Sequence, residues 1–181
     1  MNEIIKGKIR YLFTKQKQES LHKEQGNWLT FVAPVTGKAV SLDEVEDLVF
    51  SQRIAGDGLA IIPTNGKVVA PIDGVVSHLF DTSHAVSIQH PSGLRVLIHV
   101  GIDTVKLYGE GFTALVGIDQ QVKKGDELIQ FDLDLIQQAG CSIATPVVIT
   151  NMDLALKQKA MIQRNVVAGV DPVLEVLVKG I

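Results

Sequence analysis

Cysteine, aromatic residues and long apolar runs are all scarce in this chain of 181 residues. The single cysteine, Cys141, cannot form an internal disulfide, and one thiol cannot build a cysteine zinc site. This cysteine usage fits residence in the cytosol. Aromatic residues make up 5% of the chain, too few for a platform on which single-stranded nucleic acid would stack.

Membrane-spanning runs and the common catalytic signatures are also missing. No stretch is predicted to span a membrane, and charges interrupt every apolar stretch before Trp28, so a secretory signal is not expected. The chain has no Gly-rich phosphate loop ending in Lys-Ser/Thr, no Gly-x-Ser-x-Gly elbow and no His-Glu-x-x-His motif. These absences exclude the commonest nucleotide-binding, serine-hydrolase and zinc-protease classes.

The charge of the chain is small but unevenly distributed. Hydrophobic residues make up 46% of the sequence, enough for a stable core, and the formal net charge is −3, which argues against a nucleic-acid binder. Residues 1–28 hold six basic and three acidic residues, whereas the remainder holds eleven basic and seventeen acidic residues. The chain therefore has a basic arm of charge +3 and an acidic body of charge −6.

The arm is predicted to be amphipathic. Residues 1–13 fit a short helix, in which Ile5, Ile9, Leu12 and Phe13 share one face and basic residues lie between them. Residues 14–27 are polar and fit a linker, so the domain boundary is expected near Asn27. Two interpretations stay open: a frayed tail, or a helix that lies on an anionic membrane surface or docks on a partner.

The body predicts an all-β fold, an antiparallel β-sandwich with a few short helical turns. Short β-rich runs alternate with turn residues, and no long helical period is present. Helical turns are expected after Ser41, whose Ser-Leu-Asp-Glu run has the form of a capping box, after Asp132 and near Asp153. The predicted strands are Leu29–Ala33, Lys67–Ala70, Gly74–Leu79, Ala85–Gln89, Leu94–Val100, Leu128–Phe131, Pro146–Thr150 and Val173–Val178.

Two of the five histidines, His84 and His99, belong to one predicted hairpin. A two-residue turn centred between Pro91 and Ser92 would pair them directly, with Cβ atoms about 5 Å apart. Gly93 equally fits a type I turn with a bulge, which shifts the pairing by one residue. That register puts the two imidazoles on opposite faces unless another irregularity intervenes. The pattern alone leaves both registers open.

Polar residues beside the histidines suit chemistry as well as ordinary turn capping. Asp103, four residues after His99, could ligate a metal, attract a partner or orient an imidazole. Thr82 and Ser83 supply hydroxyls just before the other histidine. The residues by themselves therefore favour no single reaction.

Several runs between residues 30 and 178 carry a family resemblance. They are Gly56–Pro63 (GDGLAIIP), Val69–Gly74 (VAPIDG), Thr82–Ala85 (TSHA), His99–Thr104 (HVGIDT) and Thr145–Asp153 (TPVVITNMD). In this order they resemble the glucose class of enzyme IIA of the bacterial sugar phosphotransferase system. The resemblance implies a β-sandwich that takes a phosphoryl group from the histidine phosphocarrier protein. It passes the group to a cysteine on the IIB domain of a sugar permease.

The same resemblance implies roles for single residues. His99 corresponds to the phosphorylated histidine, His84 to the second active-site histidine, and Thr82 to the hydroxyl that bonds to it, so the imidazoles should be adjacent. Ser83 departs conservatively from the asparagine that many members carry. The implied partner-binding surface consists of rim carboxylates and an apolar collar: Asp47, Asp103, Val49, Phe50, Ile54 and Phe80.

The implied chemistry accounts for the residue types. A neutral imidazole is a good nucleophile near neutral pH, and a second imidazole can hydrogen-bond the phosphoryl oxygens in transit. No cofactor is expected, neither ATP nor a metal, because the donor is already a high-energy phosphoramidate. The acidic body would steer a basic donor. The basic arm would lie near the inner face of the membrane, where the permease sits, and the protein is expected in the cytoplasm.

Two alternatives remain on the sequence. One is a zinc-dependent peptidase of hybrid β fold with His84, His99 and Asp103 as ligands, although the expected His-x-His element is absent. Two histidines alone bind zinc weakly, but a partner's carboxylate could complete a site at His84 and His99. The other alternative is a regulatory binding module without turnover, whose partners sense the added phosphate.

Overall fold

Short antiparallel strands make up most of the regular secondary structure in this computed structural model, which describes residues 27–179. The strands are β1 (Trp28–Val32), β2 (Gly37–Val40), β3 (Asp57–Pro63), β4 (Lys67–Val69), β5 (Gly74–Leu79), β6 (Ala85–Gln89), β7 (Arg95–His99), β8 (Phe112–Ala114), β9 (Gln121–Val122), β10 (Glu127–Phe131), β11 (Thr145–Ile149), β12 (Ala155–Ala160), β13 (Arg164–Val166) and β14 (Pro172–Val178). The helical segments are η1 (Leu42–Glu44), α2 (Leu48–Ser51), η2 (Thr104–Leu107), α3 (Leu133–Gln138) and η3 (Met152–Leu154).

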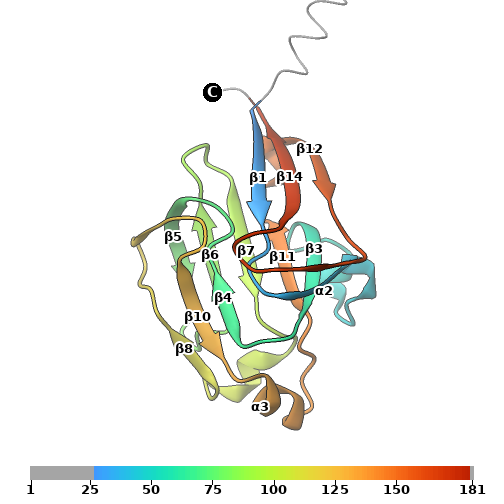
Figure 1. Cartoon of the computed structure of the whole chain (residues 1–181), viewed down its shortest axis with the longest axis vertical. Coiled ribbons are helices and arrows are strands. Elements are labelled where there is room, and N and C mark those ends of the chain that lie inside the picture. The colour runs from blue at the N-terminus through green and yellow to red at the C-terminus, as the bar shows by residue number, and fades with distance from the viewer. Residues whose placement is uncertain (1–26, 180–181) are drawn as a thin grey trace, which may run out of the picture.

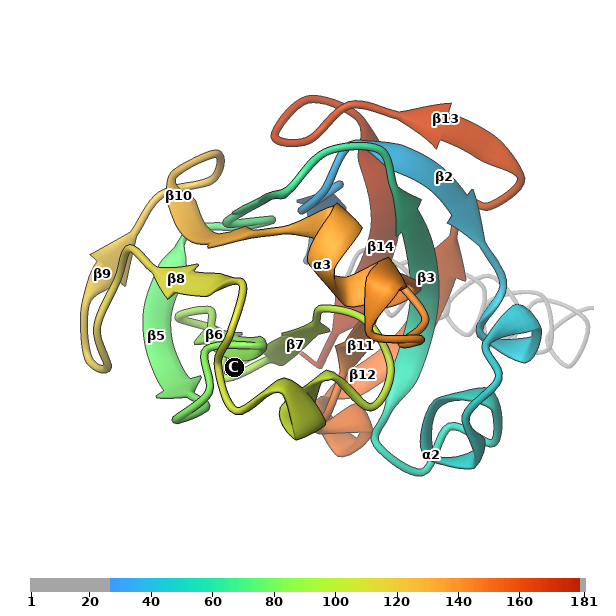
Figure 2. The ribbon, with the colours of Figure 1, turned by 90° about the horizontal axis from the view of Figure 1, so that it is seen from below.

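The strands form three antiparallel sheets (Figure 1). An eight-stranded sheet has the order β13-β2-β3-β11-β7-β6-β5-β9, and two three-stranded sheets have the orders β4-β10-β8 and β1-β14-β12. Seen from below, the large sheet runs as a curved band from β13 round to β9 (Figure 2). The predicted all-β sandwich is therefore confirmed.

The core lies between the sheets, because alternate residues of each strand point inward. On β7, Val96 and Ile98 are buried in this core, whereas Leu97 and His99 belong to the opposite face. Each sheet contributes fully buried side chains to the core: Leu59, Ile61 and Ile88 from the large sheet, Ile129 from the second, and Phe31 and Leu174 from the third.

The opposite face of the large sheet is covered by residues 41–56, the connection between β2 and β3. This connection contains η1 and α2, and in Figure 2 it packs beside β3. Its buried side chains Leu42, Val45 and Phe50 form a second apolar cluster with residues of β2, β3 and β11, and with Ile102. The face that carries His99 is thus partly roofed by a single loop.

All eight predicted strands are present, with ends that differ from the prediction by one residue at most. The capping box at Ser41 and the helix after Asp132 are confirmed as η1 and α3, and the third turn begins one residue early, at Met152. Six further strands were not predicted: β2, β3, β8, β9, β12 and β13. Most of these are short, and β12 alternates lysines with neutral residues as an exposed edge strand does.

The predicted amphipathic helix of residues 1–13 and nearly all of the linker 14–27 lie outside the described residues. The arm and the domain boundary near Asn27 therefore stay predictions. Within residues 27–179, no helix is both long enough and apolar enough to cross a membrane.

Candidate functional site

The hairpin of β6 and β7 has the bulged register. Ala85, not His84, is paired with His99, and Val86 is paired with Ile98, so direct cross-strand pairing of the two histidines is wrong. Gly93 has φ +87°, and its N–H donates to the carbonyl of His90 at 2.8 Å, as in a type I turn with a bulge. The backbone conformation of Gly93 decides the register.

A second irregularity nevertheless brings the two imidazoles together. His84 lies just before β6, after Ser83, whose φ is +55°. The chain bends there, and the N–H of Val100 donates to the carbonyl of His84 at 2.8 Å. The centroids of the two imidazole rings are 4.8 Å apart, with an interplanar angle of 79°. Adjacent imidazoles thus arise from a bend, not from strand pairing.

The tautomer of neutral His99 follows from one hydrogen bond. Its Nδ1 lies 2.8 Å from the carbonyl oxygen of Gly101, and because a carbonyl only accepts, Nδ1 must carry the proton. The lone pair is therefore on Nε2. Gly101 has φ +71°, and a Cβ there would lie 2.7 Å from the carbonyl oxygen of Ser142. Glycine at this position allows the carbonyl to reach the imidazole.

Burial determines the charge of both imidazoles. Burial, and to a smaller degree the charge of His99, lower the pKa of His84 from 6.5 to about 4. Burial also lowers the pKa of His99, although the hydrogen bond to the Gly101 carbonyl and the charge of Asp47 oppose this effect. Both rings are therefore neutral at pH 7, as a nucleophile and a hydrogen-bond donor require.

Thr82 and Phe80 flank His84. The hydroxyl oxygen of Thr82 lies 2.5 Å from Nδ1 of His84, and the ring of Phe80 lies 5.3 Å from the His84 ring in an edge-on arrangement. When Thr82 donates to Nδ1, the proton of neutral His84 is on Nε2. Thr82 can thereby present an N–H of His84 toward a group bound between the two histidines.

Asp47 and Phe50 reach His99 from the roofing connection. The carboxylate of Asp47 caps α2, accepting from the N–H groups of Val49 at 2.8 Å and Phe50 at 3.1 Å. The ring of Phe50 is buried, and its centroid lies 5.2 Å from that of His99. The cap therefore fixes the start of α2, and with it the aromatic wall beside the imidazole.

An open hollow of about 300 Å³ lies over His99, and its walls are largely apolar. Val49, one of its lining residues, is 45% exposed. The predicted site residues Ile54, Phe80, Thr82 and His84 are not among the lining residues. A larger hollow of about 680 Å³, beside β8, β10 and α3, contains neither histidine. The lining residues of the smaller hollow are Asp47, Val49, Phe50, Ala55, Leu97, His99, Ile102, Asp103 and Val105.

Most of the predicted site residues meet at this hollow. Asp103 has φ +63° and pairs with Lys106 at 2.7 Å, so a neighbouring cation already contacts this rim carboxylate. The lining residues that the sequence analysis did not assign to the site are Ala55, Leu97, Ile102 and Val105. Gly101 belongs to the HVGIDT run, but no role was assigned to it. The alternation along β7 could have identified Leu97, since it lies two residues before His99 on the same face.

No group of three or more histidine, cysteine or carboxylate side chains in residues 27–179 is arranged to hold a metal ion. The zinc-peptidase alternative needs three ligands, of which His84 and His99 are adjacent. The carboxylate of Asp103 instead contacts Lys106.

Comparison with protein families now identifies the chain. Residues 29–155 match the profile of the phosphoenolpyruvate-dependent sugar phosphotransferase system, EIIA 1. The chain belongs to this EIIA family. This EIIA protein is therefore a phosphotransferase component of the sugar phosphotransferase system, a phosphoryl carrier that acts through a phosphohistidine. Its partners are the histidine phosphocarrier protein and a IIB domain.

Relatives of this EIIA protein support the assignment. It is 48% identical over 150 residues to a "PTS system glucose-specific EIIA component" of Bacillus anthracis, covering 83% of this chain and 91% of that protein. A protein of the same name from Haemophilus influenzae is 43% identical over 142 residues, covering 78% and 82% of the two chains. The names favour the phosphotransferase over the peptidase and over a module without turnover.

Two other comparisons concern architecture. The solved glucose permease IIA from Mycoplasma capricolum has a TM-score of 0.77 and 38% sequence identity, covering 82% of this chain and 96% of that one. A "PTS system glucosamine-specific EIICBA component" of Bacillus subtilis is 52% identical over 122 residues, 67% of this chain and 19% of that protein. The same kind of sequence thus also occurs within longer proteins.

The low pKa of His84 predicts a loss of stability in acid. The unfolded chain binds a proton at this residue near pH 6.5 and the folded protein near pH 4, so the contribution of His84 is complete above pH 6.5 and falls as the pH drops toward 4. Between pH 7 and pH 4.5 the loss should be about 2 kcal/mol. Urea unfolding at the two pH values measures it. His84→Gln is the control, because glutamine does not titrate; equal pH dependence in both proteins would refute the assignment.

Proposed function

We propose that Nε2 of His99 is the atom that carries the phosphoryl group. The observation that carries this proposal is the hydrogen bond between Nδ1 and the Gly101 carbonyl at 2.8 Å, which leaves the lone pair on Nε2 in a neutral, partly buried ring. The adjacent His84 ring and the open hollow support the same atom.

The transfer step is balanced without a cofactor. The Nε2 lone pair attacks phosphorus as the phosphorus–nitrogen bond of the donor phosphohistidine breaks, and that bond's electron pair returns to the donor imidazole. The proton on Nδ1 stays in place, so phosphorylated His99 keeps its bond to Gly101. Such transfers have loose transition states, and positioning and charge stabilisation therefore account for most of the lowering of the activation barrier.

His84 and Thr82 stabilise the phosphoryl group in transit. Thr82 donates to Nδ1 of His84, and Nε2–H of His84 then donates to a phosphoryl oxygen. Because the pKa of His84 is about 4 in the unphosphorylated protein, the ring approaches as a neutral donor and does not repel an incoming positive partner.

The rim recognises partners in two ways. Val49, Phe50, Ile54 and the nearby Phe80 supply apolar contact around the histidines, which excludes water from the labile bond. Asp47 and Asp103 add negative charge, and a basic donor would take Lys106's place on Asp103, since such an exposed pair is weak.

Replacing His99 by alanine should abolish phosphorylation. Purified protein is incubated with the phosphorylated histidine phosphocarrier protein, and acid-labile phosphate on the chain is quantified. Wild type should accept about one phosphoryl group per chain and His99→Ala less than about a hundredth of that, since no other residue replaces the nucleophile. Stable phosphate on the variant would refute the assignment.

His84→Gln should still accept phosphate but pass it on to a IIB domain at least about tenfold more slowly.

We further propose a glucose-type permease as the acceptor, because the relatives are named glucose-specific or glucosamine-specific. Phosphorylated protein is mixed with a panel of purified IIB domains of glucose, glucosamine and unrelated sugar classes, and the rate of phosphate loss is followed. Glucose-class domains should be at least about tenfold faster than the unrelated ones. Equal rates across the panel would contradict a glucose-type acceptor.

The cytoplasm, with residues 1–13 near the anionic inner face of the membrane, is the proposed location. Lys6, Lys8 and Arg10 alternate with apolar residues there, so anionic vesicles should retain the full chain more than a chain beginning at Asn27. Co-sedimentation with vesicles containing phosphatidylglycerol measures this, and about 0.5 M salt should release the protein. Equal sedimentation of both chains would exclude a role for the arm.

A further inference from the structure

Helix α2 ends in a Schellman cap that has an arginine, Arg53, where glycine is usual. The N–H of Arg53 donates to the carbonyl of Phe50, and the N–H of Ile54 donates to the carbonyl of Val49, both at 2.9 Å. This is the pair of bonds of a Schellman cap, in which the residue after the C-cap Gln52 adopts the left-handed conformation. Glycine is the usual residue at that position, whereas here Arg53 has φ +58°.

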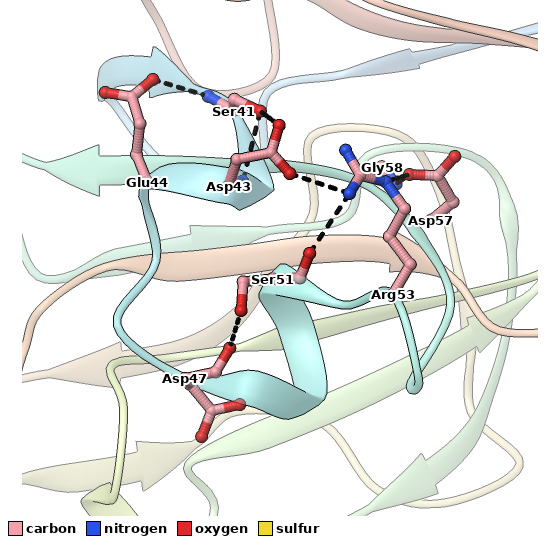
Figure 3. A network of polar contacts seen from close by, with 8 residues as sticks. All are labelled: Ser41, Asp43, Glu44, Asp47, Ser51, Arg53, Asp57 and Gly58. Atoms are coloured by element: carbon pink, nitrogen blue, oxygen red, sulfur yellow. Dashed lines mark hydrogen bonds and ion pairs between the residues drawn. The ribbon is translucent and has the colours of Figure 1, made fainter.

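The side chain of Arg53 explains why an arginine occupies this position. Nη1 donates to Asp43 at 2.8 Å and to the carbonyl of Ser51 at 3.2 Å, and Nε donates to Asp57 at 3.0 Å (Figure 3). These partners belong to η1, to the last residue of α2 and to the first residue of β3. One guanidinium therefore joins two points of the connection 41–56 to the first residue of β3.

These contacts of the Arg53 guanidinium, called the clasp below, add little to the stability of the whole protein. The side chains of Arg53, Asp43 and Asp57 are 42%, 65% and 38% exposed, and such exposed ion pairs contribute little to the free energy of unfolding. A backbone conformation that disfavours arginine would offset part of that contribution. The clasp is better explained by what the connection holds in place.

The connection 41–56 forms one wall of the hollow over His99. Phe50, with its ring 5.2 Å from the His99 ring, lies within α2, and Asp47 is the residue that caps it. The Schellman cap sets the exposed Ile54 next to Val49, which lines the hollow. Apart from the buried cluster beneath, the polar contacts that fix the end of α2 to its surroundings converge on Arg53.

We propose that Arg53 is a positioning residue for phosphoryl transfer. Its guanidinium holds α2 against His99, so that Phe50 shields the phosphohistidine from water and the rim keeps the shape that the phosphocarrier meets. The proposal rests on the proposed function of His99.

The proposal predicts an effect opposite to that of charge alone. Removing Arg53 makes the surface more negative, so a pure charge effect would attract a basic donor more strongly and lower its KM. Loss of positioning instead loosens the docking wall, raises KM and admits water to the phosphohistidine. The sign of the change in KM therefore separates the two.

Arg53→Gly is the informative variant, because glycine suits the left-handed turn while the clasp is lost. We expect KM for the phosphorylated phosphocarrier to rise about threefold or more, the half-life of the phosphohistidine to fall by a similar factor, and the thermal midpoint to move by less than about 2 °C. Arg53→Lys, which keeps the charge, should recover part of both losses.

Two comparisons complete the experiment. Arg164→Ala is the matched control: Arg164 is also 42% exposed and pairs with Asp171, but it lies on β13, which three other strands separate from β7 in the sheet. It should leave KM and the half-life unchanged.

The effects of Asp43→Asn and Arg53→Gly on KM should not add up in the double variant, since both substitutions break the same contact.

The outcomes are distinguishable. Wild-type KM and half-life in Arg53→Gly, or a lower KM, would overturn the role of Arg53 while leaving His99 intact. If the wild-type protein accepts no phosphate, or if His99→Ala accepts it stably, the proposed function fails and the role of Arg53 fails with it.

Discussion

The hydrogen bond from Nδ1 of His99 to the carbonyl of Gly101 is the constraint on which the site depends. It fixes which nitrogen of the neutral ring is free, and it requires a glycine whose backbone turns into the left-handed region. The next turn is held in the same way, because the buried hydroxyl of Thr104 donates to the carbonyl of Val100 at 2.6 Å and Ile102 pairs with Ser142. The chain after β7 is therefore shaped around one imidazole.

The rest of the site is built from departures from regular strand geometry. His84 reaches His99 because the chain bends at Ser83, and Asp47 and Phe50 reach it because a long connection folds back over the sheet. The regular strand β7 supplies His99, and the irregular segments bring the other side chains to it. The imidazole of His99 and the side chains that surround it thereby lie on one face of the large sheet.

Periodicity predicted the regular part of this structure well. The eight strands with alternating or continuous apolar residues were found, as was the capping box at Ser41, because these patterns are local. The register of the hairpin was undecidable from the residues, since Gly93 fits either turn. Four-residue α2 has no helical period, and Arg53 gave no signal because glycine, not arginine, marks a helix end. The family resemblance supplied the site residues that no period could.

The hollow over His99 limits how many partner proteins can bind at the same time. If Nε2 of His99 carries the phosphoryl group, donor and acceptor must both reach it through this hollow of about 300 Å³, and so they must take turns. Each must leave before the other arrives, and tight binding of either would stop the relay. The exposed, weakly paired rim is therefore suited to brief encounters.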